Sequence, residues 1–259
     1  MTRALLAFIL ASVVSVQAIA DVTIKSTANS KGFGLTGVTT SVVYIKGLKM
    51  RVEATIGDKH ITSIYDIDAQ KMYILDAKKK EVDAWDMGAF AQEMSKTVSA
   101  EGMHANLKPN GQTKSVGGQN AEGYDIDIVV PANVAGTPMM IAMTGVSWIA
   151  KGAPGSAEYS AFYKGAAEKG WIFTDPRAAK AQPGQAKAMA EMYTQFAQIG
   201  GIPLESQMDI KATGEGMVAA AMARMGGVST TTIIDSVEPG PLADTLFAPP
   251  ADYAVKTKQ

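Results

Sequence analysis

Two histidines and no cysteine limit the chemistry that this chain of 259 residues can perform. A Ser-His-Asp triad would need His60 or His104 as its general base. His60 begins a strand-like segment with polar flanks, His104 lies in a polar stretch that we expect to be a loop, and neither has a catalytic motif beside it. The lack of cysteine removes thiol nucleophiles, redox pairs and thiolate metal sites. We therefore predict no catalytic residues and no enzymatic activity.

The segment from Gly32 to Gly37 has the spelling of a dinucleotide-binding motif, G-x-G-x-x-G. Such a motif needs a strand before it and a helix N-terminus after it to hold the pyrophosphate. Residues 39–46 are β-branched and strand-like, so we expect a flexible loop between strands and no cofactor. The paired acids Asp125 and Asp127 alternate with apolar residues, which is typical of the solvated outer face of a strand rather than of a metal site.

Methionine is unusually frequent, with 15 residues. Three lie in a strand-like segment at positions 139, 140 and 143, Met189 and Met192 share a helical stripe, and further methionines fall between Met217 and Met225. Thioethers are soft ligands for copper(I), whereas flexible methionine side chains also line adaptable apolar cavities. Because these residues are scattered among alanine and valine, we favour core or cavity lining and predict no metal site. Copper(I) binding stays an alternative.

The first 20 residues have the three zones of a secretory signal peptide. Arg3 supplies a positive start, Ala4 to Val16 is almost uninterrupted apolar sequence, and Ala18-Ile19-Ala20 provides a cleavage site. We expect cleavage after Ala20, with residues 21–259 forming a single domain in the periplasm. No cysteine follows the cleavage site, so we expect no lipid anchor, and no later segment is long and apolar enough to span a bilayer.

The charge of the chain is nearly balanced. Removing Arg3 from the 24 basic residues leaves 23 against 25 acidic residues, a net charge of −2. Nucleic-acid binders usually carry a basic excess, so we predict no nucleic-acid partner. The three consecutive lysines, Lys78 to Lys80, are expected on a solvated hairpin tip, with a patch for an anionic partner as the alternative.

A two-residue period over most of the first half predicts half-buried strands. Met50, Val52, Ala54 and Ile56 alternate with polar residues most clearly. Short connections between such segments predict an antiparallel meander. Helical spacing appears over 87–100, 157–168 and 185–199, and Asp175-Pro176 is a helix-start signature.

Six segments follow one another along the chain as a recognisable set: Val43 to Glu53, Ile67 to Asp76, Gly118 to Tyr124, Trp148 to Lys151, Gly201 to Ser206 and Leu246 to Tyr253. Together they resemble a family of secreted bacterial proteins catalogued as a domain of unknown function. That family is similar to the LolA-like lipoprotein-carrier group, which also includes envelope-stress sensors. The resemblance implies an α+β fold, in which a curved antiparallel sheet forms an incomplete barrel and helices cover its concave face. It also implies an apolar cavity, which takes lipoprotein acyl chains in the carriers. The carriers place an arginine in this cavity, and this chain has no assignable counterpart. Arg51 could be considered, but its position in the alternation of its strand directs it to the outer face.

The leading hypothesis is a non-catalytic periplasmic binding or carrier protein for a lipid, an acyl chain or another hydrophobic ligand. The alternative is an envelope protein-interaction or stress-response factor without a small ligand. The expected cavity lining consists of inward-facing residues of one strand and an apolar stripe of one helix: Met50, Val52, Ala54, Ile56, Met189, Met192 and Phe196.

Overall fold

The computed structural model describes residues 21–32, 35–97, 103–134, 137–215, 217, 220–221, 224 and 226–258. The predicted signal peptide, residues 1–20, lies outside the described residues, as do Met222 and Met225 of the methionine-rich segment. Within the described residues, twelve strands form one sheet, and four α-helices and a 3-10 turn connect them.

The strands are β1 Val22–Gly32, β2 Leu35–Lys46, β3 Lys49–Ile56, β4 Lys59–Asp66, β5 Lys71–Asp76, β6 Glu81–Asp86, β7 His104–Val116, β8 Gln119–Val134, β9 Thr137–Ala150, β10 Ile202–Gly214, β11 Val228–Pro239 and β12 Ala254–Lys258. The helices are α1 Met87–Thr97, α2 Ser156–Glu168, α3 Pro176–Ala181 and α4 Pro183–Ile199, and the 3-10 turn η1 spans Asp244–Phe247.

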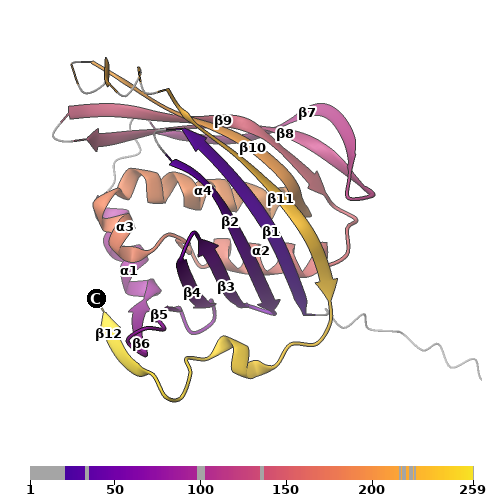
Figure 1. Cartoon of the computed structure of the whole chain (residues 1–259), viewed down its shortest axis with the longest axis vertical. Helices are drawn as coiled ribbons and strands as arrows, with labels where there is room; N and C mark the ends of the chain where they lie inside the picture. Colours follow the sequence, from indigo (N-terminus) through magenta and orange to yellow (C-terminus); the bar gives the residue numbers. More distant parts are fainter. Residues whose placement is uncertain are drawn as a thin grey trace, which may run out of the picture.

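The sheet joins two meanders, with strand order β12-β6-β5-β4-β3-β2-β1-β11-β10-β9-β8-β7. β11 pairs with β1 on one side and with β10 on the other, and so connects the meander β1–β6 to the meander β7–β10. Neighbouring strands are antiparallel except at one edge, where β12 runs parallel to β6. The sheet curves around α2 and α4, which lie on its concave side (Figure 1). The predicted α+β fold with helices over the concave face is confirmed.

Local sequence explains how the helical layer begins and ends. Asp175 caps α3 by accepting a hydrogen bond from the backbone N–H of Arg177, and Pro176 occupies the first turn. This confirms the predicted helix start. Gly200 ends α4 with a φ of 73°, which glycine adopts without the steric cost that a side chain would bring.

Two local predictions can be compared directly with the structure. His104 begins β7, so the prediction that it lies in a loop was wrong. β7 is an edge strand in which Ala105 and Leu107 face the core. Its many polar residues hide this alternation in the sequence. Gly32 ends β1 and β2 begins at Leu35, so the described residues of the G-x-G-x-x-G segment lie in strands and not in the loop that was predicted. The helix that a nucleotide site would require at this place is replaced by a strand.

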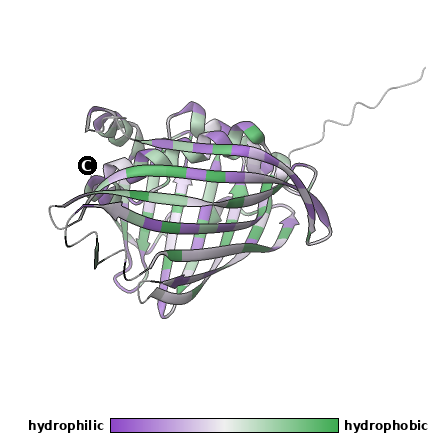
Figure 2. Ribbon diagram, turned by 90° about the horizontal axis from the view of Figure 1, so that it is seen from above, coloured by the Kyte–Doolittle hydropathy of each residue, from purple (hydrophilic) through white to green (hydrophobic). Residues whose placement is uncertain are grey.

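The core lies between the concave face and the helices. A row of register partners crosses six strands on the inward face: Val22, Ile45, Met50, Tyr65, Met72 and Trp85. Each is at most 8% exposed, and all six belong to a larger buried cluster that we name the first core cluster and that also includes Phe90 of α1, Phe162 of α2 and Trp171. The second core cluster is built on β7–β9 from residues that include Leu107, Ile126, Ile128 and Met143, and Ala188 of α4 packs on it. Figure 2 shows hydrophobic and hydrophilic residues alternating along the strands, as a sheet with one covered face requires.

Candidate functional site

The inward face of β3 is buried at one end of the strand and accessible at the other. Met50 is 3% exposed, Val52 and Ala54 are half-buried, and Ile56 is 47% exposed. Ile61, the register partner of Ala54 on β4, is 43% exposed. The helical layer therefore covers the Met50 end of the concave face and leaves the Ile56 end open to solvent.

The predicted helical part of the lining lies on α4, opposite a different part of the sheet. Met189, Met192 and Phe196 are half-buried, and Met192 and Phe196 pack against the second core cluster. Met50 and Val52 instead belong to or pack on the first core cluster. The structure thus places the predicted residues around the concave face in two groups, and the assignment of all seven to one cavity stays a prediction.

Aromatic side chains from the sheet and the helices gather under the helical layer, a feature that sequence reasoning missed. Tyr163 of α2 stacks on Tyr193 of α4 with ring centroids 5.4 Å apart, and Phe173 lies 4.9 Å from Tyr193. Tyr65 of β4 reaches Phe173 at 5.7 Å. Burial raises the pKa of the Tyr163 and Tyr193 hydroxyls above the ordinary tyrosine value. Tyr159, Tyr163 and Phe173 are partly buried and pack against the first core cluster, so these rings contribute to the apolar contacts between the sheet and the helices.

Small hydroxyl residues occupy the middle of the concave face. Three hydroxyl pairs join neighbouring strands: Ser26 with Ser41 at 2.7 Å, Ser30 with Thr230 at 3.0 Å, and Ser147 with Ser206 at 2.8 Å. Their register places them on the same face as the two core clusters. Hydroxyl pairs therefore accompany the apolar side chains on the concave face.

Two buried donors remain without a partner among the described residues. The indole N–H groups of Trp85 and Trp171 are both buried without a hydrogen bond. A buried donor left unpaired costs about 1–3 kcal/mol. Both tryptophans belong to the first core cluster.

The two histidines lie at exposed positions, and Met139 and Met143 are buried. His60 is exposed and its Nδ1 lies 3.0 Å from the hydroxyl of Thr55, and His104 lies 3.3 Å from Asp127 at an exposed position. Within the described ranges, His, Asp and Glu residues form no group of three or more that could hold a metal ion. Met139 and Met143 are each 3% exposed, packed inside the sheet core.

Arg51 points away from the concave face, as its parity predicts. Its Nε lies 2.7 Å from the carboxylate of Glu53, and its Nη1 donates to the Leu246 carbonyl at 3.2 Å. The 3-10 turn η1 therefore covers the outer side of β3, where Arg51 anchors it. Arg51 is a structural residue of that outer face and does not enter the concave face.

Among the helices of the described residues, none is long and apolar enough to cross a membrane.

No protein-family model and no curated protein matches the sequence. Among solved structures, an uncharacterized conserved protein from Thermus thermophilus is similar at 9% identity, with a TM-score of 0.41 and coverage of 93% of this chain and 91% of that one. A domain assigned to outer membrane lipoprotein sorting in Vibrio parahaemolyticus gives 8% identity, a TM-score of 0.30, and coverage of 89% and 90%. A DUF1329 family protein from Desulfovibrio piger ATCC 29098 gives 9% identity, a TM-score of 0.29, and coverage of 88% and 90%.

The TM-scores are low, and the architecture of this chain is established by its own strand order and helix placement.

Proposed function

We propose that this protein binds a lipid acyl chain, or a similar hydrophobic ligand, on the concave face of its sheet and carries it unchanged. The supporting observation is the exposure gradient along β3, from 3% at Met50 to 47% at Ile56. Apolar side chains that face inward and yet remain accessible are typical of ligand sites rather than of a closed core.

The proposed lining comes from both layers. Met50 closes the base, and the remaining members are Val52, Ala54, Ile56, Met189, Met192 and Phe196. Flexible methionine side chains on α4 adjust their shape to a chain of variable length and curvature. We place this activity in the periplasm, after cleavage of the predicted signal peptide behind Ala20.

A ligand in this position would gain contact with apolar surface that water now covers. Burying apolar area is favourable by about 25 cal/mol per Å². Binding of this kind requires no nucleophile, base or metal, and we propose no catalytic role for any residue. The protein-interaction alternative differs because it requires no small ligand on the inward face.

The test adds bulk to the proposed site. Ala54→Trp should lower the affinity for a fluorescent fatty acid at least about tenfold, because the indole would fill the space beside Val52 and Ile56. Thr55→Trp, the neighbouring residue on the opposite face, is the matched control and should leave affinity unchanged. Thermal unfolding of both variants checks that the fold is intact.

Lipid extraction and native mass spectrometry of protein purified from the periplasm supply a second readout. We expect co-purified acyl chains. A protein that carries no lipid and binds no fatty acid, in the intact wild-type form, would overturn the proposal and favour the protein-interaction alternative.

A further inference from the structure

A charged pocket of about 610 Å³ lies at the accessible end of the concave face. We name it the rim pocket; it is bounded by Lys59 of β4, Asp83 of β6, Lys258 of β12 and Arg177 of α3. Six lysine or arginine and five aspartate or glutamate side chains line it, together with His60 and with apolar residues that include Ile61 and Ile74. Its wall is thus made by segments from the first third of the chain, the helical layer and the C-terminal strand.

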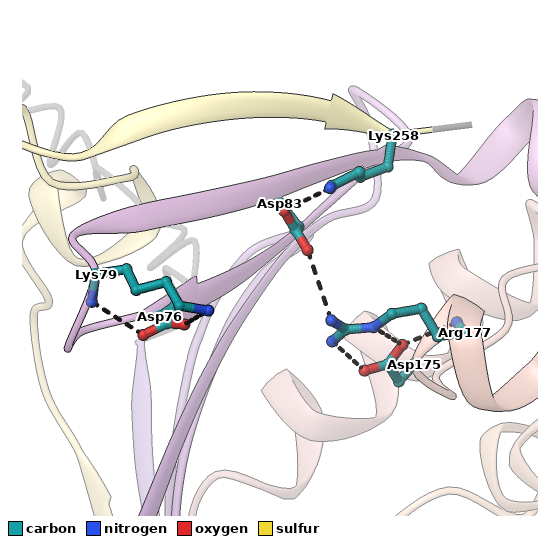
Figure 3. A network of polar contacts seen from close by, with 6 residues as sticks. All are labelled: Asp76, Lys79, Asp83, Asp175, Arg177 and Lys258. Carbon is teal, nitrogen blue, oxygen red and sulfur yellow. Dashed lines mark hydrogen bonds and ion pairs between the residues drawn. The ribbon is translucent and has the colours of Figure 1, made fainter.

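Most of these charges already hold one another in place (Figure 3). Asp83 lies 3.2 Å from Lys258 and 3.6 Å from Arg177, whose Nη2 lies 2.6 Å from Asp175. Burial alone would raise the pKa of Asp175, but hydrogen bonds from the Arg177 guanidinium and backbone outweigh it and keep the pKa below its ordinary value. These ion pairs form what we name the frame of the pocket.

Two further pairs complete the frame, Lys79 with Asp76 at 3.2 Å and Lys256 with Glu81 at 2.6 Å. Two lysines remain: in the part of the chain that the structure describes, neither Lys59 nor Lys78 forms an ion pair with a carboxylate.

Asp58 is the remaining lining carboxylate without an ion pair among the described residues. The four paired cations balance the four paired carboxylates. The two remaining lysines and the single carboxylate of Asp58 then give the rim pocket a net charge of one positive unit.

The rim pocket continues directly from the proposed acyl site. Lys59 is the register partner of the exposed Ile56 on the inward face, and Ile61, which lines the pocket, is the partner of Ala54. A ligand that lies along the inward face of β3 would therefore meet an uncompensated lysine where the apolar surface ends.

We propose that the rim pocket binds the anionic, phosphate-class head group of an amphiphile whose acyl tail lies on the concave face, with Lys59 and Lys78 as its direct ligands. This inference rests on the proposed function. A phosphate offers several strong acceptor oxygens, and hydrogen bonds from ammonium groups to it are charge-assisted and strong. The paired residues of the frame line the pocket around the head group.

The test compares ligands with the same tail in the mature chain, residues 21–259, by titration calorimetry below the concentrations at which they form micelles. Dodecyl phosphate should bind about tenfold more tightly than dodecyl maltoside. The double variant Lys59→Gln and Lys78→Gln should lose this preference while it keeps its affinity for dodecyl maltoside. Because neither lysine has an ion pair, the change leaves no carboxylate unpaired.

The matched control is Lys164→Gln with Lys211→Gln, which removes two charges at exposed positions that also have no ion pair among the described residues. It should keep the preference for dodecyl phosphate. Loss of the preference in this control as well would overturn the assignment to Lys59 and Lys78.

The remaining outcomes separate the two proposals. Equal, measurable affinity for both amphiphiles would overturn the head-group site and leave acyl binding standing. Inorganic phosphate that binds as tightly as dodecyl phosphate would overturn the link to an amphiphile and indicate a site for the free anion. Failure of both amphiphiles to bind would overturn both proposals.

Discussion

Met50 and Ile56 lie on the same face of the same strand, yet we expect opposite consequences when each is replaced by alanine. Met50 is 3% exposed inside the first core cluster, so Met50→Ala should lower the free energy of unfolding by about 2–5 kcal/mol, the range for buried large-to-small changes. Ile56 is 47% exposed. Ile56→Ala removes three carbon groups, each of which contributes about 0.8 kcal/mol when fully buried. Because about half of the side chain is exposed, we expect the free energy of unfolding to fall by roughly 1 kcal/mol.

Urea unfolding of both variants measures these values, provided that the slope m stays at the wild-type value. Ligand binding should show the reverse order. Ile56→Ala should weaken the binding of a fluorescent fatty acid more than Met50→Ala does. If Ile56→Ala destabilised the protein as much as Met50→Ala, the far end of the concave face would be packed. That result would refute the accessible site.

Three further predictions test the frame around the site. Asp175 has a folded pKa below its ordinary value of 3.8, so its pairing stabilises the fold above that pH and the benefit is lost as pH falls; Arg177→Gln should therefore reduce stability at neutral pH and differ less from wild type in acid unfolding experiments. Burial raises the pKa of Tyr163 and Tyr193 above 10, so both should stay protonated in alkaline absorbance titrations until the circular dichroism signal is lost, and ionisation without unfolding would contradict this. Gly145→Ala should destabilise by about 1–3 kcal/mol in urea unfolding, since a Cβ would overlap the Gln207 carbonyl, whereas Gly37→Ala, which has open space around it, should be nearly neutral.

Alternation along the strands was enough to predict which face each residue of β3 occupies. It could not predict how far the helical layer reaches, because periodicity reports the direction of a side chain and not what lies above it. Met50 and Ile56 therefore looked equivalent in the sequence, and only the packing of the helical layer against the sheet separates them.

Sites formed by residues that are far apart in the sequence could not be predicted from local sequence patterns. The hairpin tip at Lys78 to Lys80 was predicted correctly, but not that Lys78 and Lys79 line a pocket with Arg177 and Lys258. The parallel pairing of β12 with β6 brings Lys258 beside Asp83, and no local pattern indicates that pairing. The aromatic cluster combines residues of β4, α2 and α4 for the same reason.

Photo-crosslinking with a diazirine-bearing fatty acid, followed by peptide mapping, tests acyl binding on the concave face most directly. We predict that the label is found on β3 and α4, at Val52, Ile56, Met192 or Phe196, and that unlabelled fatty acid suppresses it. Val38 and Ile233 are the internal control, because both are exposed apolar residues whose register places them on the outer face. Label confined to these outer-face residues, or label that competitor does not suppress, would contradict acyl binding on the concave face.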